Sequence, residues 1–122
     1  AGGIRTVAPS YVRVGVRAEV LPVSAEEAGR LEGRLRERLA AYLHPLTGGA
    51  DGRGWQFGEA VYLSGVAALV ESTPGVDAVR FLQLMVGSAV YGDRVPIAPE
   101  QLCAPGVSQL RIFVPSVPYA LG

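Results

Sequence analysis

The amino-acid sequence predicts a single two-layer α+β domain over residues 1–114, in the order β-α-α-β-β-β, with two helices on one face of a small mixed or antiparallel sheet. Three observations predict this fold. Residues 11–20 alternate apolar and polar side chains, residues 24–43 carry an apolar stripe with helical spacing, and residues 76–86 are rich in β-branched and apolar side chains. Residues 115–122 contain two prolines, and we expect them to form an extended tail.

Length and composition fit a domain with a core of its own. The chain has 122 residues, of which 49% are hydrophobic and 18% are charged, so it can bury a sizeable core. Its formal net charge is zero, so no overall positive field favours nucleic acid. A single cysteine excludes an internal disulfide, and one cysteine with one histidine is too few for a typical zinc site. The absence of an initiator methionine suggests a piece of a longer protein.

The first strand and the first helix are predicted by clear periodicity. In YVRVGVRAEV (11–20) the even positions are valines or alanine, which indicates a strand with one buried face that ends at Pro22. Ser24 and Glu27 have the spacing of a capping box, so a helix is expected to begin there and run to about Leu43. Its apolar stripe consists of Ala28, Leu31, Leu35, Leu39 and Tyr42.

A second helix is predicted over residues 58–73, GEAVYLSGVAALVEST. Apolar residues occupy much of its circumference, which indicates either burial in the core or cover by a partner surface. We expect Gly58 and Glu59 to open this helix, with the carboxylate at its electropositive end. No apolar stretch in the chain reaches the length of a membrane span, so no span is expected.

Further strands are predicted in the second half of the chain. Pro74-Gly75 fits positions i+1 and i+2 of a type II turn. Residues 76–86 are apolar on both parities, which predicts a central strand covered on part of both faces. A short edge strand is expected over 94–98, where Pro96 suits an edge, and 108–114 alternates again.

The segment 44–58, HPLTGGADGRGWQFG, holds five glycines, the single histidine and the single tryptophan. A phosphate-binding function is disfavoured because Gly54 precedes Trp55 instead of a lysine, and the chain contains no lysine. Catalysis would draw on His44, Asp51, Arg53 and Glu59, the polar candidates of the segment. A structural role at the end of the helix is enough to explain the histidine, however, since a donor side chain there can satisfy free carbonyl groups.

We therefore favour an architectural role for this segment. Pro45 should stop the first helix, and the glycines should allow sharp turns. Trp55 and Phe57 should anchor the loop by burying their rings, each of which could contribute a few kcal/mol. No catalytic, cofactor-binding or metal-binding residue is expected. The candidate structural and possible interface residues are His44, Pro45, Gly48, Gly49, Gly54, Trp55, Phe57 and Gly58.

The same segment carries a family resemblance. APSYVRVGVRAEV, a helix ending in YLHPLTGG, and DGRGWQFGEAVYLSGVAALVESTPGVDAV together resemble the C-terminal region of baseplate J-like proteins, putative baseplate assembly proteins of contractile phage tails and related injection particles. The resemblance covers roughly residues 8–114. It also implies that LCAPGVSQLRIFV (102–114) forms the closing hairpin of that region.

The resemblance implies a structural function. Such proteins are wedge subunits that assemble as multiple copies around the tail hub, so the expected partners are other wedge and hub subunits and further copies of the chain. It implies assembly in the cytoplasm within a tail-like particle, with no enzyme activity, cofactor or small-molecule substrate. The alternative is a small-molecule-binding regulatory α+β domain, for which Arg80, Gln83 and Arg94 are the best-placed polar residues.

Overall fold

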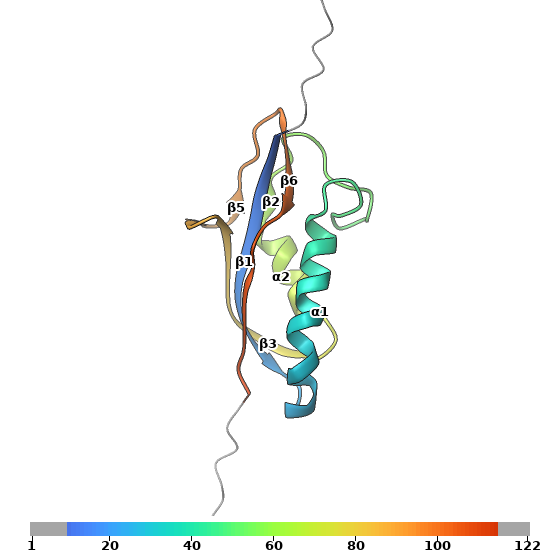
Figure 1. The fold of residues 1–122 in the computed structure, drawn as a ribbon, viewed down its shortest axis with the longest axis vertical. Helices are drawn as coiled ribbons and strands as arrows, with labels where there is room; N and C mark the ends of the chain where they lie inside the picture. The colour runs from blue at the N-terminus through green and yellow to red at the C-terminus, as the bar shows by residue number, and fades with distance from the viewer. Residues whose placement is uncertain (1–9, 115–122) are drawn as a thin grey trace, which may run out of the picture.

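Strand β1 (Ser10–Pro22) forms the middle of a five-stranded mixed sheet, and both helices lie on one side of it (Figure 1). The computed structural model describes residues 10–114. The predicted α+β architecture is confirmed. The remaining elements are α1 (Ala25–Leu43), β2 (Val61–Tyr62), α2 (Leu63–Glu71), β3 (Val76–Val86), β4 (Ala89–Tyr91), β5 (Arg94–Val95), β6 (Gln101–Pro105) and β7 (Gln109–Ile112).

The sheet has the order β4-β3-β1-β6, and β7 also pairs with β1. Strand β3 runs antiparallel to β1, whereas β6 and β7 both run parallel to it. The expected closing hairpin over 102–114 is therefore wrong. Gly106 donates its N–H to Val14, and Val16 donates its N–H to the Ser108 hydroxyl, so the link between β6 and β7 stays on β1. The two strands are successive stretches along one edge of β1, interrupted by residues 106–108.

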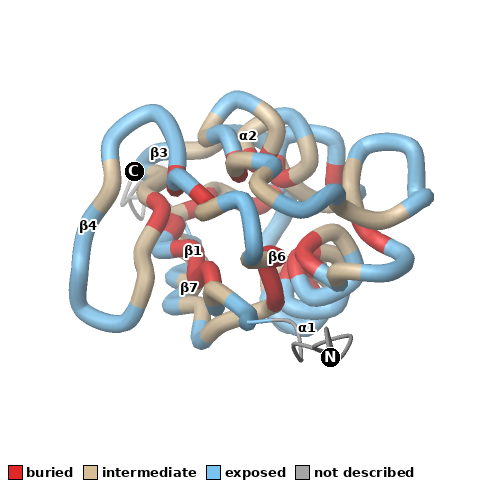
Figure 2. The backbone as a smooth tube through the Cα atoms, turned by 90° about the horizontal axis from the view of Figure 1, so that it is seen from above, coloured by how far each residue is buried: buried red, intermediate tan, exposed pale blue. Residues whose placement is uncertain are grey.

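The hydrophobic core lies between the sheet and the two helices. The even-numbered residues of β1 from Val14 to Val20 are buried, as their alternation predicts. Helix α1 buries four leucines at helical spacing, and α2 buries Val66 and Val70. Figure 2 shows the buried positions gathered along β1, β6 and the helices, while β4 and the outer loops are exposed. The buried leucines of α1 are Leu31, Leu35, Leu39 and Leu43.

Helix α1 begins and ends close to the predicted positions. The Ser24 hydroxyl accepts the N–H of Glu27 at 3.3 Å, which confirms the N-terminal cap. Glu27 pairs with Arg34 at 3.3 Å instead of completing the reciprocal half of the capping box. Neither helix of the described residues is long and apolar enough to cross a membrane.

Helix α2 is shorter than predicted and begins five residues later. Gly58 and Glu59 do not open it; the helix starts at Leu63, after the two-residue strand β2. Strand β2 pairs with β5, and the Leu63 N–H donates to Asp93 at 2.8 Å. Tertiary pairing with a distant segment therefore keeps residues 58–62 out of the helix.

The second half of the chain confirms the predicted turn, and β3 has half-buried residues on both faces. The Val76 N–H donates to Thr73 across Pro74-Gly75, and Gly75 has a φ of 100°, as a type II turn requires. Within β3, Leu84 on the helix side is fully buried, while on the other face Phe81 is exposed and Gln83 and Met85 are half-buried, so that face is covered in part. The edge strand expected over 94–98 is the two-residue β5, which ends before Pro96. The expected tail over 115–122 lies outside the described residues.

Candidate functional site

Residues 44–58, here called the glycine–tryptophan loop, fold back on the end of α1. The carbonyl oxygen of Tyr42, in the last turn of α1, accepts two hydrogen bonds from this loop, from the Gly49 N–H and from the Trp55 indole nitrogen, both at 2.8 Å. The Gly48 N–H donates to the His44 carbonyl oxygen, also at 2.8 Å. Carbonyl groups that a helix end leaves without intrahelical partners are thus satisfied by the loop itself.

Two glycines of the loop are required by close backbone approach. A Cβ atom on Gly48 would lie 2.1 Å from the Tyr42 carbonyl oxygen, and one on Gly54 would lie 2.6 Å from the Leu46 carbonyl oxygen. Gly54 also has a φ of 91°, a conformation that side chains disfavour. The Gly54 N–H donates to Gly48 at 2.8 Å, which joins the two halves of the loop. The prediction that these glycines serve tight turns agrees with this geometry.

His44 stabilises the loop in a way that differs from the prediction. Its Nδ1 accepts hydrogen bonds from the N–H groups of Leu46 and Thr47, at 3.2 and 3.3 Å. The expected donation from the ring to free helix carbonyls is therefore wrong. Pro45 and the residues after it form a turn around the ring, and an accepting nitrogen suits the N–H groups that this turn leaves free.

The two aromatic anchors expected in the loop have opposite environments. Trp55 is half-buried, and its ring meets Tyr42 edge to face with centroids 5.4 Å apart and an angle of 87°. Phe57 is 58% exposed, so its predicted role as a buried anchor is wrong. Phe57 is not part of the buried core cluster or packed against it, so a large apolar side chain of the loop faces solvent. Leu46, in the same loop, is 70% exposed.

The end of the loop is tied to the sheet edge. Gly58, with a φ of 76°, donates its N–H to the Gln101 carbonyl oxygen of β6 at 3.0 Å. The Glu59 carboxylate accepts the Gln56 N–H at 2.8 Å, and the Glu59 N–H donates to the Gln56 carbonyl oxygen at 3.0 Å. Glu59 therefore closes a local turn instead of capping a helix.

The side chains of His44 and Asp51 in the loop, and of Glu59 directly after it, accept hydrogen bonds from backbone N–H groups of the loop. Asp51 accepts the Arg53 N–H at 3.0 Å, and His44 and Glu59 bond to backbone N–H groups as described. An open depression of about 410 Å³ is bordered by Asp51, Arg53, Gln56 and Glu59. Across residues 10–114 no three histidine, cysteine, aspartate or glutamate residues are grouped as a metal would need. The arrangement suits a stiff connector.

A buried thiol lies near the loop and was not placed there by sequence reasoning. Cys103 of β6 is fully buried, with its sulfur 3.8 Å from the Leu43 carbonyl oxygen. Burial, with a further contribution from the Glu59 charge, raises the pKa of Cys103 to about 12. Burial also raises the pKa of Tyr42, with contributions from Cys103 and Glu59. The thiol is a packing group of the core, as expected for an unreactive buried cysteine.

The residues named for a small-molecule site come from strands of two different sheets. Arg80 and Gln83 belong to β3, whereas Arg94 belongs to β5, which pairs with β2 in a separate two-stranded sheet. Arg80 stacks over Phe113, with 5.0 Å between the guanidinium carbon and the ring centroid. These positions give no convergent polar set, so no specific observation favours that alternative.

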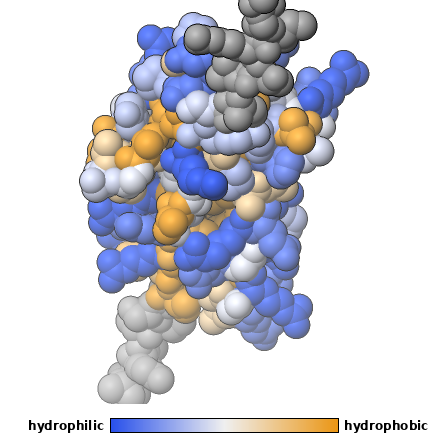
Figure 3. Space-filling view, turned by 45° about the horizontal axis from the view of Figure 1, so that its top comes forward, coloured by the Kyte–Doolittle hydropathy of each residue, from blue (hydrophilic) through white to orange (hydrophobic). Residues whose placement is uncertain are grey.

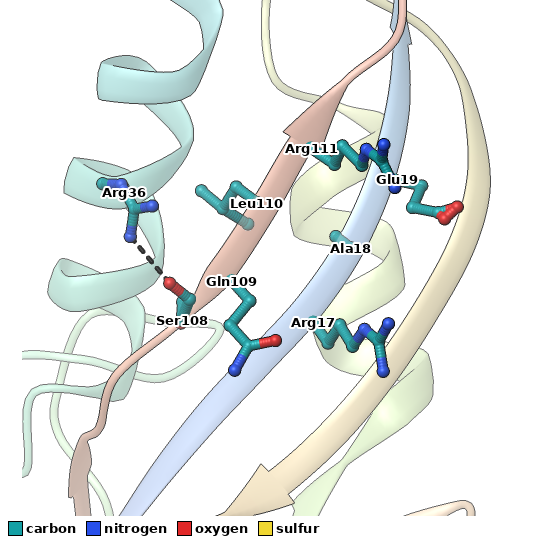
Figure 4. Close-up of a pocket in the computed structure, with 8 residues that line it drawn as sticks. All are labelled: Arg17, Ala18, Glu19, Arg36, Ser108, Gln109, Leu110 and Arg111. Carbon is teal, nitrogen blue, oxygen red and sulfur yellow. Dashed lines mark hydrogen bonds between the residues drawn. The ribbon is translucent and has the colours of Figure 1, made fainter.

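The sheet face that points away from the helices has a composition that the sequence analysis did not single out. Arg17 of β1 and Arg111 of β7 lie on this face beside Glu19, whereas Arg36 reaches the Ser108 carbonyl oxygen from α1 (Figure 4). These residues border an open depression of about 380 Å³ at the β7 edge. The polar residues at the odd positions of 11–20 indicated that such a face exists. Which residues of β3 and β7 lie beside them on this face depends on how these strands pair with β1.

Comparison with known proteins adds no assignment: no protein-family model matches the chain, and no curated protein sequence matches it significantly. The baseplate resemblance therefore stays a prediction from the sequence.

Proposed function

We propose that this chain is a structural assembly component of the baseplate of a contractile tail-like particle, a wedge subunit that acts through protein–protein contacts. On this proposal it assembles in the cytoplasm with other wedge and hub subunits and with further copies of itself. It performs no reaction and takes no cofactor.

The observation that carries this proposal is the use of the glycine–tryptophan loop. The residues that carry the resemblance, above all Gly48, Gly54 and Trp55, are engaged in contacts that fix the loop against α1. These residues hold the shape of the loop, and the side chains of His44, Asp51 and the adjacent Glu59 accept hydrogen bonds from backbone N–H groups of the loop. A rigid loop of this kind supports a structural function for the protein.

Exposed apolar side chains on a fixed loop also support a contact function. Phe57 and Leu46 are large, exposed and carried by a loop with its own hydrogen-bond network. Aromatic and aliphatic groups held in place lose little conformational entropy on binding. Figure 3 shows that apolar patches on the side it draws are interrupted by hydrophilic side chains, a pattern common in non-obligate interfaces.

The test is assembly with subunits encoded beside the gene. Sheath, tube and spike genes in the neighbourhood are expected, and the full-length protein co-expressed with its neighbours should elute as a complex in size-exclusion chromatography with light scattering. The variant Leu46→Ser/Phe57→Ser should weaken the complex. The variant Val23→Ser/Val107→Ser alters two other exposed apolar residues and serves as the control. A protein that stays monomeric with every neighbour would contradict the proposal.

A further inference from the structure

The outward face of the sheet combines arginines with aromatic rings. Its main residues come from three strands or their ends and are here called the open sheet face: Arg17, Glu19, Arg80, Phe81, Arg111 and Phe113. Neither helix covers it, since both lie on the opposite side (Figure 1). Arg17, Arg80, Arg111 and Phe81 are exposed, and Glu19 is half-buried.

The rings hold the three arginines in place. Arg17 stacks over Phe81 at 5.7 Å, while Arg80 and Arg111 both stack over Phe113 at 5.0 Å. Stacking of this kind fixes a guanidinium while leaving its N–H groups free to point outward. Within residues 10–114, the ion pairs are those of Arg34 with Glu27 and Arg36 with Glu32, so none of the three stacked arginines has a carboxylate partner.

We infer that the open sheet face is a docking surface for a carboxylate-rich segment of a different protein subunit. The open sheet face carries three positioned guanidinium groups and one carboxylate, that of Glu19, although the whole chain has a net charge of zero. Each guanidinium offers N–H donors in the fork that suits carboxylate groups, and the rings beneath supply apolar contact. Charge complementarity thus specifies an acidic partner. This inference deepens the proposed assembly function and rests on it for the identity of the partner.

Two other occupants fit the face less well. Bases of single-stranded nucleic acid need open ring faces for stacking, but guanidinium groups already lie over both Phe81 and Phe113. A second copy docked face to face would bring the arginines of both copies together, with Glu19 as the one acidic residue of the open sheet face. Like charges brought together across an interface disfavour that pairing.

The first experiment uses a fluorescein-labelled poly-L-glutamate peptide, titrated with the full-length protein and followed by fluorescence anisotropy at low salt. The variant Arg17→Glu/Arg80→Glu/Arg111→Glu should weaken binding by about tenfold or more. The control Arg30→Glu/Arg53→Glu/Arg94→Glu has the same net charge but changes exposed arginines outside the open sheet face, and it should bind several-fold more tightly than the face variant. If the charge reversal disturbs folding, Arg17→Gln/Arg80→Gln/Arg111→Gln replaces it.

The outcomes separate the inference from the proposed function. Equal loss in the face and control variants, or no binding of the peptide, would overturn the inference. Tighter binding of labelled oligo-dT than of the peptide would assign the face to nucleic acid, and self-association abolished by the face variant would assign it to a second copy. Co-purification of neighbouring subunits with both variants alike would overturn the inference while leaving the assembly function standing. Peptide binding by the face without any subunit binding would contradict only the assembly function.

Discussion

The indole nitrogen of Trp55 donates a hydrogen bond of 2.8 Å to the carbonyl oxygen of Tyr42, and the two rings meet edge to face. The same carbonyl oxygen accepts the Gly49 N–H at 2.8 Å. One backbone group at the end of α1 thus fixes the beginning and the later part of the loop. Trp55 also packs against the buried core cluster, so the loop is joined to the core by both polar and apolar contacts.

Replacement of Trp55 by alanine should destabilise the protein through loss of the ring and of this hydrogen bond. We expect a decrease of about 3 kcal/mol in the free energy of unfolding, measured by urea denaturation. Trp55→Phe keeps a ring but removes the donor, so it should cost less, about 1–2 kcal/mol. Phe57→Ala is the control: its exposed ring should change stability by less than about 0.5 kcal/mol. Equal effects at positions 55 and 57 would contradict this account.

Replacement of Gly48 by alanine should be strongly destabilising. The added methyl group would lie 2.1 Å from the Tyr42 carbonyl oxygen, a backbone atom that cannot swing away. We expect a loss of about 3 kcal/mol in unfolding free energy. Gly29→Ala is a matched control in α1, where the methyl group would meet nothing within 4 Å. There the substitution should stabilise the protein by up to about 1 kcal/mol, so the two variants should shift the urea midpoint in opposite directions.

Replacement of His44 by alanine should loosen the turn after α1. The change removes the acceptor for two N–H groups, and we expect a loss of about 1 kcal/mol. His44→Asn offers an oxygen acceptor at a similar position and should recover much of that loss. Amide hydrogen exchange at Leu46 and Thr47 should be faster in the alanine variant. Unchanged exchange rates there would show that the Nδ1 contacts contribute nothing.

Cys103 should react slowly with thiol reagents in the native protein. Its pKa of about 12, against an ordinary 9.0, reduces the thiolate population near neutral pH by about a thousandfold, and burial blocks access as well. Labelling with a disulfide reagent at pH 8 should be slow in buffer and fast in urea. Rapid labelling of the native protein would contradict the buried position.

The same thiol should contribute to the loss of stability at alkaline pH. Folding favours the neutral thiol, because the folded pKa lies above the unfolded one. The contribution is complete below about pH 9 and is lost as the pH rises toward 12. The pKa of Tyr42 is also raised by burial, so Cys103→Ala is needed to isolate the contribution of the thiol. That variant should lose less stability than the wild type between pH 9 and 12, as measured by urea denaturation.

The glycine–tryptophan loop illustrates how far local reasoning reaches. The glycine positions and Pro45 predicted a tightly turning loop between the helices, because steric limits on the backbone act within a few residues. The sequence could not predict which of Trp55 and Phe57 is buried, since both are aromatic residues two positions apart in one loop. Their difference depends on Tyr42, whose carbonyl oxygen and ring give Trp55 a partner that Phe57 lacks.

By itself the sequence determined the layers: the alternation in residues 11–20 and the leucine stripe of α1 are local patterns that predict one buried face each, and Pro74-Gly75 predicts the turn between α2 and β3. Tertiary structure alone decided the order and direction of the strands. Whether 102–114 turned back or continued along β1 depended on two contacts more than ninety positions apart in the chain: the Gly106 N–H donates to Val14, and the Ser108 hydroxyl accepts the Val16 N–H. Helix α2 was likewise shortened by pairing between β2 and β5. Strand pairings join distant parts of the chain mainly through backbone groups that all residue types except proline share in full, so local side-chain patterns do not encode them.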